Sequence, residues 1–306
     1  MLVTIPFAIT DANLNSCSLP ENDYAVWATS TSYSVGDNVI STTTHSVYEC
    51  LVAHTSGAST NPDTDTSDPP NWLRISATNI WRAFDNIISD PTIGDSVTET
   101  YSLNGFTQPA NGVTCLGLDG ISVQLVVTDP NDGEVFDETV SLIDNSMIVD
   151  AYTYAFDPVR YRTEAIFSGI PPYAAATFDL TFTAASGEVP EIGEIVLGRE
   201  YQIGETLFGT TVSIEDYSVK ERDQWGNAII TERPFAKLID FDFVVRTEQI
   251  RRAATLLETV RATPAVFNAG TDTEQYGVTV YGFYRGWSIT TGATISDATM
   301  EVEGLV

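Results

Sequence analysis

The sequence predicts a mainly β protein with one main helix. Short apolar runs recur at a period near two along the chain, and turn-forming residues separate them. Threonine, valine, tyrosine and glycine are used heavily, whereas only 18% of the residues are charged, which is typical of an ordered β protein. Residues 247–262 repeat their apolar side chains at three- and four-residue spacing instead. We therefore expect one amphipathic helix among many strands.

The chain of 306 residues is too long for one ordinary core, so two or three domains are expected. Composition and turn signals divide it into a lead-in at 1–20, a small β domain at 21–76, a β-sandwich at 77–198 and an α+β domain at 199–306. The apolar opening of the lead-in predicts one strand. We expect that strand to pack against a later domain.

The formal net charge of −28 opposes direct contact with nucleic acid or an anionic membrane surface. Residues 1–198 carry 26 acids and four bases, whereas residues 199–306 carry 16 acids and ten bases. The nearly balanced C-terminal part suits a packing surface within an assembly, with the acidic part facing solvent. A solvated surface of no special role is the alternative.

Cysteine usage and the N-terminal residues indicate folding in a cytoplasm. Cys17, Cys50 and Cys115 are odd in number and lack a C-x-x-C spacing, so neither a disulfide framework nor a zinc site is expected. The first residues lack the basic region of a signal peptide, and no apolar run is long enough to span a membrane. We expect no membrane insertion.

Widely spaced aromatic residues characterise the small domain at 21–76. The pattern is W-x5-Y-x2-GD-x-V, then VYE and a closing tryptophan, with aromatic positions Trp27, Tyr33, Tyr48 and Trp72. It resembles the chitin-binding carbohydrate-binding modules of bacterial chitinases, which implies aromatic rings that stack on sugars. Where that family usually presents exposed tryptophans, residues 50–55 read CLVAHT. We therefore favour a core role for the four aromatic residues and keep carbohydrate binding as the alternative.

Three aspartates in the loop 56–70 raise the question of a calcium site: Asp63, Asp65 and Asp68. An EF-hand loop also needs a glycine and a distal glutamate, but Asp68 and Arg74 stand at those positions. We expect no metal.

Residues 77–198 read as short strands joined by turns. We expect strands at 98–103, 112–118, 122–128, 135–142, 152–156, 164–167 and 177–183. Strands of this number and spacing indicate a β-sandwich. The opening W-x-x-F-D at 81–85 resembles the galactose-binding-like jelly rolls of phage tail proteins. Tyr152, Tyr154, Phe156 and Tyr161 are expected to form one face of a core strand, with ligand binding as the alternative.

Residues 191–243 read as strand, turn and strand repeated, with glycines at the turns. A further strand is expected at 241–246, the helix at 247–262, and strands at 266–268, 277–287 and 298–304. The runs IGEIVLG, IG-x-T-L-x-G, I-x-DYS-x-K-x-x-D-x-x-GN and RPF resemble the assembly domain of tail-tip and baseplate structural proteins of tailed bacteriophages, similar to distal tail proteins.

This resemblance implies a structural virion protein at the phage tail tip, made in the host cytoplasm. It implies a ring-like homo-oligomer of six copies, with other ring symmetries left open, that contacts tail-tube and hub proteins. The acidic units would project toward the host and contact cell-surface polysaccharide if they bind sugar. Two alternatives stay open: a host-glycan adhesin as the primary role, or the accessory module of a polysaccharide-degrading system.

The sequence holds no catalytic signature. His45 and His54 are its only histidines, and no H-E-x-x-H, Walker A or G-x-G-x-x-G motif occurs. Glycoside hydrolases use a pair of acidic residues, but such a pair is not informative here, because 42 acids always offer some pair at a suitable separation. We expect no enzymatic activity, no catalytic residues and no cofactor.

Overall fold

The computed structural model describes residues 1–146, 148–270 and 277–306. Strands account for 47% of the chain and helical residues for 9%. The prediction of a mainly β protein is therefore confirmed. The expected helix is present as a single main helix of 13 residues, formed by η3 (Thr247–Gln249) and α2 (Ile250–Thr259).

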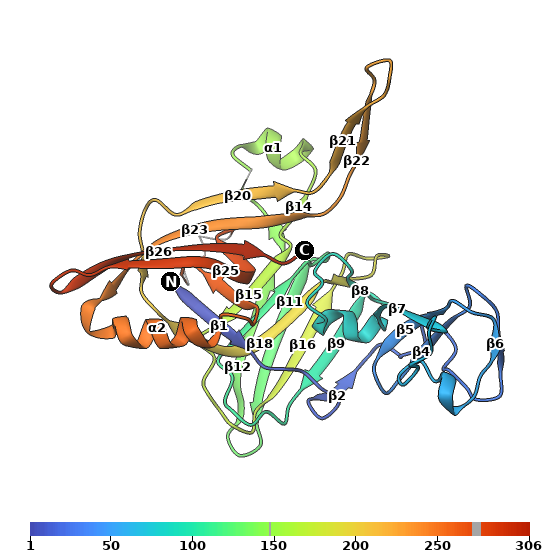
Figure 1. The fold of residues 1–306 in the computed structure, drawn as a ribbon. Helices are drawn as coiled ribbons and strands as arrows, with labels where there is room; N and C mark the ends of the chain where they lie inside the picture. Colours follow the sequence, from blue (N-terminus) through green and yellow to red (C-terminus); the bar gives the residue numbers. More distant parts are fainter. Residues whose placement is uncertain (147, 271–276) are drawn as a thin grey trace.

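A ten-stranded antiparallel sheet runs through the molecule (Figure 1). Its order is β15-β10-β18-β1-β24-β25-β26-β23-β19, and β20 also pairs with β23. The strands are β1 (Leu2–Pro6), β10 (Gly112–Leu116), β15 (Glu164–Ser168), β18 (Glu194–Gln202), β19 (Glu205–Thr206), β20 (Thr211–Asp216), β23 (Phe235–Arg246), β24 (Ala265–Asn268), β25 (Thr279–Thr290) and β26 (Ile295–Gly304).

A five-stranded sheet packs against one end of the large sheet and forms a β-sandwich with it. Its strands, in spatial order, are β12 (Gly133–Ser141), β11 (Ser122–Asp129), β16 (Thr177–Thr183), β9 (Thr98–Leu103) and β2 (Leu14–Cys17). In β11 and β16, alternate side chains are buried, as expected for a sheet with one face on a core. Phe178 and Phe182 of this sheet share that core with Phe167 and Leu197 of the large sheet.

Helix α2 covers the other part of the large sheet. Its residues Ala253 and Leu257 are buried, and they share a core with Phe241, Phe267 and Met300 of the strands beneath. The spacing of the apolar residues therefore predicted the buried face of the helix correctly. The exposed face carries Arg251, Arg252 and Glu258.

The two ends of the large sheet are joined through β18 and β1. β1 is the strand expected in the lead-in, and it pairs with β18 on one side and β24 on the other. β18 runs without a break through residues 198 and 199, where the sequence suggested a domain boundary. The sandwich and the helix-covered region therefore share one hydrogen-bonded sheet.

The small domain lies beside the sandwich (Figure 1). Its strands are β4 (Asn38–Ser41), β5 (Ser46–Cys50) and β7 (Trp72–Ala77) in one sheet and β3 (Ser32–Tyr33) with β6 (His54–Thr55) in another, with the short helix η1 (Ala58–Thr60) in its loop. The 3-10 helix η2 (Asn79–Phe84) connects this domain to the sandwich.

The described residues also form three further two-stranded sheets. They are β8 (Thr92–Ile93) with β17 (Glu191–Ile192), β13 (Ile143–Asp144) with β14 (Arg160–Tyr161), and β21 (Val219–Arg222) with β22 (Ala228–Thr231). The β21–β22 hairpin projects away from the rest of the molecule (Figure 1).

One expected strand was wrong. Residues 152–156 form the short helix α1 (Ala151–Phe156) instead. Oδ1 of Asp150 accepts a hydrogen bond from the backbone N–H of Thr153 at 2.8 Å, which caps the first turn. Tyr152, Tyr154 and Phe156 are exposed, so they do not form a face of a core strand.

We expect Gly198→Ala to destabilise the fold. Gly198 pairs with Pro6 on β1 and with Gly112 on β10, and a Cβ at this position would lie 2.0 Å from the carbonyl oxygen of Ile5. Because the nearest atoms belong to the backbone of Ile5 and Pro6, no side-chain movement can relieve the clash. It should lower the free energy of unfolding by about 1–3 kcal/mol. Urea unfolding measures the loss.

Gly286→Ala in β25 is the matched control, since a Cβ there meets nothing within 4 Å. It should change the free energy of unfolding by less than about 0.5 kcal/mol. Equal stability of the two variants would contradict the close approach of β1 to β18.

Candidate functional site

The structure brings the four aromatic residues of the small domain together as its core. Tyr48 and Trp72 are only 8% and 6% exposed, and Trp27 and Tyr33 pack against them. The Trp72 ring meets Tyr33 edge-on at 5.1 Å, and its Nε1 donates to the carbonyl of Thr60 at 2.8 Å. Buried rings such as Tyr48 and Trp72 have no free face to offer a sugar. Saccharide binding by this domain stays a prediction.

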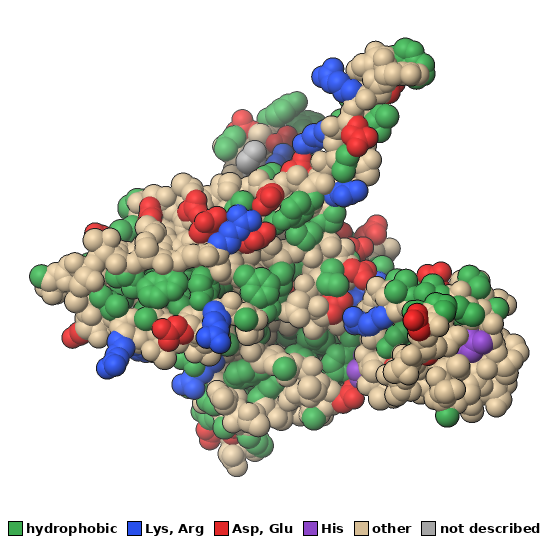
Figure 2. Space-filling model, in the orientation of Figure 1, with side chains coloured by type: hydrophobic (Ala, Val, Ile, Leu, Met, Phe, Trp, Pro, Cys, Tyr) green, Lys and Arg blue, Asp and Glu red, His purple; other side chains and the backbone are tan. Residues whose placement is uncertain are grey.

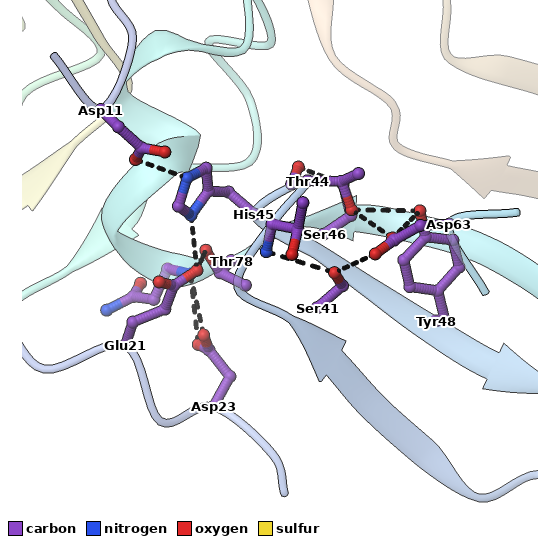
Figure 3. A network of polar contacts seen from close by, with 12 residues as sticks. Asp11, Glu21, Asp23, Ser41, Thr44, His45, Ser46, Tyr48, Asp63 and Thr78 are labelled. Atoms are coloured by element: carbon purple, nitrogen blue, oxygen red, sulfur yellow. Dashed lines mark hydrogen bonds and ion pairs between the residues drawn. The ribbon is translucent and has the colours of Figure 1, made fainter. Parts of the chain in front are cut away.

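Asp63 holds the loop of the small domain against β4 and β5. Its carboxylate accepts hydrogen bonds from the hydroxyls of Ser41 at 2.6 Å, Thr44 at 2.8 Å and Tyr48 at 3.3 Å (Figure 3). Asp65 accepts from the backbone of Ser67 and Asn71 within the same loop. These aspartates therefore have structural partners.

His45 fastens the small domain to the lead-in. Its Nε2 lies 2.7 Å from Oδ1 of Asp11, and its Nδ1 lies 2.9 Å from Oε1 of Glu21 (Figure 3). The ring also stacks on Trp81 of η2, with centroids 4.2 Å apart. Both ring nitrogens of His45 therefore face carboxylate oxygens.

The same junction reaches η2 through hydrogen bonds. Oγ1 of Thr78 donates to Oε1 of Glu21 at 2.8 Å, and the backbone N–H of Asn79 donates to the Asp23 carboxylate at 3.1 Å. Glu21 and Asp23, at the start of the small domain, thus contact the N-terminal end of η2, while Asp11 of the lead-in contacts His45. These contacts orient the small domain on the sandwich.

Exposed apolar side chains gather at one end of the large sheet. β20 exposes Val212 and Ile214, and the projecting hairpin exposes Trp225, Ile229 and Ile230. Figure 2 shows hydrophobic side chains along the hairpin and at its tip. Within residues 1–146, 148–270 and 277–306, β20 pairs with β23 only. We call β20 and the β21–β22 hairpin the edge surface.

A second exposed aromatic group lies on α1. Tyr152, Tyr154 and Phe156 are 68%, 75% and 72% exposed, and the rings of Tyr152 and Phe156 lie 4.8 Å apart. Tyr161 on β14 is 42% exposed. The alternation of these residues resembles a strand, and only the capping pair Asp150 and Thr153 signals the helix.

Sequence reasoning missed a buried carboxyl group, Glu194 on β18. It is 4% exposed, and its Oε2 accepts the backbone N–H of Asn86 at 2.8 Å. Burial raises its pKa to about 9, and the neighbouring charge of Asp85 acts in the same direction. Oη of Tyr281 donates to Oδ1 of the same Asn86. The sequence signal is an acid directly before the apolar run at 195–197.

No group of three or more His, Cys, Asp or Glu side chains among the described residues could hold a metal ion. No helix in the described part of the chain is long and apolar enough to cross a membrane. Cys17, Cys50 and Cys115 are free thiols. The chain matches no protein-family model, and no curated protein matches it.

We expect Trp72→Ala to unfold the small domain. Removing this buried ring leaves a cavity among Val39, Tyr48 and Cys50, and such truncations cost about 3–5 kcal/mol. Thermal unfolding followed by tryptophan fluorescence measures the loss. Leu73→Ala is the control because Leu73 is 51% exposed. Unchanged stability together with lost retention on chitin would instead indicate a sugar platform.

We expect Glu194→Gln to stabilise the protein at neutral pH. The pKa of Glu194 rises from 4.5 to about 9 on folding, so the folded state holds its proton more tightly than the unfolded state. This group therefore costs the native protein stability as the pH rises from 4.5 to about 9. The variant should gain on the order of 1–3 kcal/mol near pH 7.

The gain should vanish as the pH falls well below 4.5, where the group is protonated in both states. Urea unfolding of Glu194→Gln and of Glu191→Gln, a control on β17, at acidic and neutral pH gives the comparison. A gain that is independent of pH would show that proton binding by Glu194 is not its cause.

Proposed function

We propose that this protein is a structural subunit of the distal tail or baseplate of a tailed phage, which oligomerises through its C-terminal region and displays its other domains outward. The resemblance of 191–243 to tail-assembly domains suggests this role. The edge surface is the observation that carries it. Val212 and Ile214 are 47% and 63% exposed on a strand that, among the described residues, has one unpaired side.

An unpaired strand edge with apolar side chains invites pairing with another chain. The adjacent hairpin strengthens this reading, because an isolated two-stranded hairpin is marginally stable in water. All four residues of β22 are exposed. A neighbouring copy would pair with the edge and cover the hairpin. The exposed face of helix α2 offers a separate contact face.

The distribution of charge supports the same orientation. Residues 199–306, which contain the edge surface and α2, carry ten bases and 16 acids. Residues 1–198 carry 26 acids and four bases. Copies that meet through the C-terminal region avoid most of the mutual repulsion, and the acidic domains face outward.

One observation favours a second candidate, a host-glycan adhesin. Tyr152, Tyr154 and Phe156 present exposed aromatic rings on α1, and such rings can stack on the apolar faces of sugars. The two functions are compatible, since an outward domain of a tail protein can bind a glycan. They differ in whether assembly requires the edge surface.

We expect the purified chain to form a closed ring with peripheral knobs in negative-stain images. Light scattering should give a multiple of the chain mass of 33.3 kDa. The double variant Val212→Lys and Ile214→Lys should return the mass to one chain, because buried like charges oppose association. Circular dichroism checks that the variant keeps its strands.

Val35→Lys is the matched control, because Val35 is 65% exposed on the small domain. It should leave the ring intact. A wild-type chain that stays monomeric at every concentration would remove self-assembly from the proposal and favour the adhesin. A ring that survives the double variant would place the contact elsewhere than the edge surface.

A further inference from the structure

A cavity of about 320 Å³ lies where the lead-in, η2, the large sheet and the loop after α2 meet. Apolar and aromatic side chains form most of its wall, with Phe7, Phe84, Val196 and Tyr281 as the larger ones. Its volume lies at the lower end of the range for small-molecule sites. This cavity is separate from both the edge surface and α1.

Glu194 supplies an acidic group to this apolar cavity. Alternate residues of β18 face opposite sides of the sheet, so Glu194 lies on the same face as Val196, whose cluster includes Tyr281. Glu194 is 4% exposed and lines the cavity, with the Asn86 N–H bound to one oxygen. Burying the charged form of a carboxyl group to this degree is costly unless a partner compensates the charge.

No positive charge balances this acid at the cavity wall. The described lining residues include no lysine or arginine. Asp85 lies close enough to act on Glu194 through its charge, and Oδ2 of Asp85 is buried without a hydrogen-bond partner among the described residues. Arg74 and Arg82 oppose the charge of Asp85, whereas the charge that acts on Glu194 is that of Asp85. The field at Glu194 itself therefore favours a cation.

We propose that this cavity binds a small organic ammonium ion. Its apolar body would pack on Phe7, Phe84 and Tyr281, and its cationic head would pair with the Glu194 carboxylate. Aromatic rings attract ammonium groups through their π faces, and a carboxylate attracts a cation more strongly in a dry site than in water. This inference does not depend on the proposed assembly role.

Binding exchanges a proton for the cation. Burial raises the pKa of Glu194 to about 9, so the group is protonated in the empty site near neutral pH. The titratable groups that face it are Asp85 and Tyr281, and burial also raises the pKa of each. The segments at 6–9 and 263–264 contribute only uncharged residues. Each bound ammonium ion therefore displaces one proton, and affinity increases with pH.

Calorimetric titration of the full chain with benzyltrimethylammonium tests this proposal, because the probe keeps its charge at every pH. We expect saturable binding at one site in physiological salt, with a dissociation constant that falls about tenfold for each pH unit between about 6.5 and 8.5. Benzyl alcohol, which has the ring without the charge, should show no such dependence on pH.

Glu194→Gln should abolish saturable binding and its pH dependence, whereas Glu191→Gln should preserve both. Ala8→Trp provides a second variant that leaves the acid in place, since Ala8 lines the cavity and is exposed. Its larger side chain should block entry and weaken binding at least about tenfold. Circular dichroism of each variant confirms the fold.

Three results would overturn the proposal. They are an absence of saturable binding at millimolar probe, equal binding by wild type and Glu194→Gln, and a dissociation constant that does not change with pH. Equal weakening by Glu191→Gln would indicate general attraction to an acidic protein and would count against a defined site. None of these results bears on ring formation, which light scattering measures independently.

Discussion

The backbone pairing of β18 is the constraint on which the rest of the structure depends. β10 pairs with its first half, from Glu194 to Gly198, and β1 pairs with its second half, from Gly198 to Gln202. Gly198 is the one residue of β18 that pairs with both strands, with Gly112 of β10 on one side and Pro6 of β1 on the other. Hydrogen bonds between paired strands fix their relative positions. Because β10 and β1 pair with different halves of β18, this one strand connects the sandwich core to the core under α2. The orientation of the two cores follows from one strand.

Local patterns predicted the elements well where a single face is buried. Strands 98–103 and 177–183 coincide with β9 and β16, because alternation of apolar and polar residues follows directly from packing on one side. The apolar spacing of α2 was equally clear. The order of strands in the large sheet could not be predicted, because β1 pairs with residues near 200 and 268 and no local signal encodes such pairing.

In the candidate sites, too, the sequence predicted local features but not those that depend on distant residues. The aromatic core of the small domain followed from spacing, and the structure places those residues as spacing suggested. α1 was missed because its aromatic residues alternate as in a strand, whereas the capping bond of Asp150 decides the conformation. Glu194 could not be found because its burial depends on Tyr281 and Asn86, which lie far away in the sequence. Tertiary contacts create that site.

The position of β1 has a consequence for synthesis of the chain. Leu2 lies opposite Gln202 on one side and Asn268 on the other, so the ribosome delivers this strand long before either neighbour exists. The sandwich sheet that holds β9, β11 and β16 can form early from nearby segments, whereas the large sheet closes only when most of the polypeptide has emerged. A nascent copy therefore lacks its finished C-terminal region while it is still attached to the ribosome.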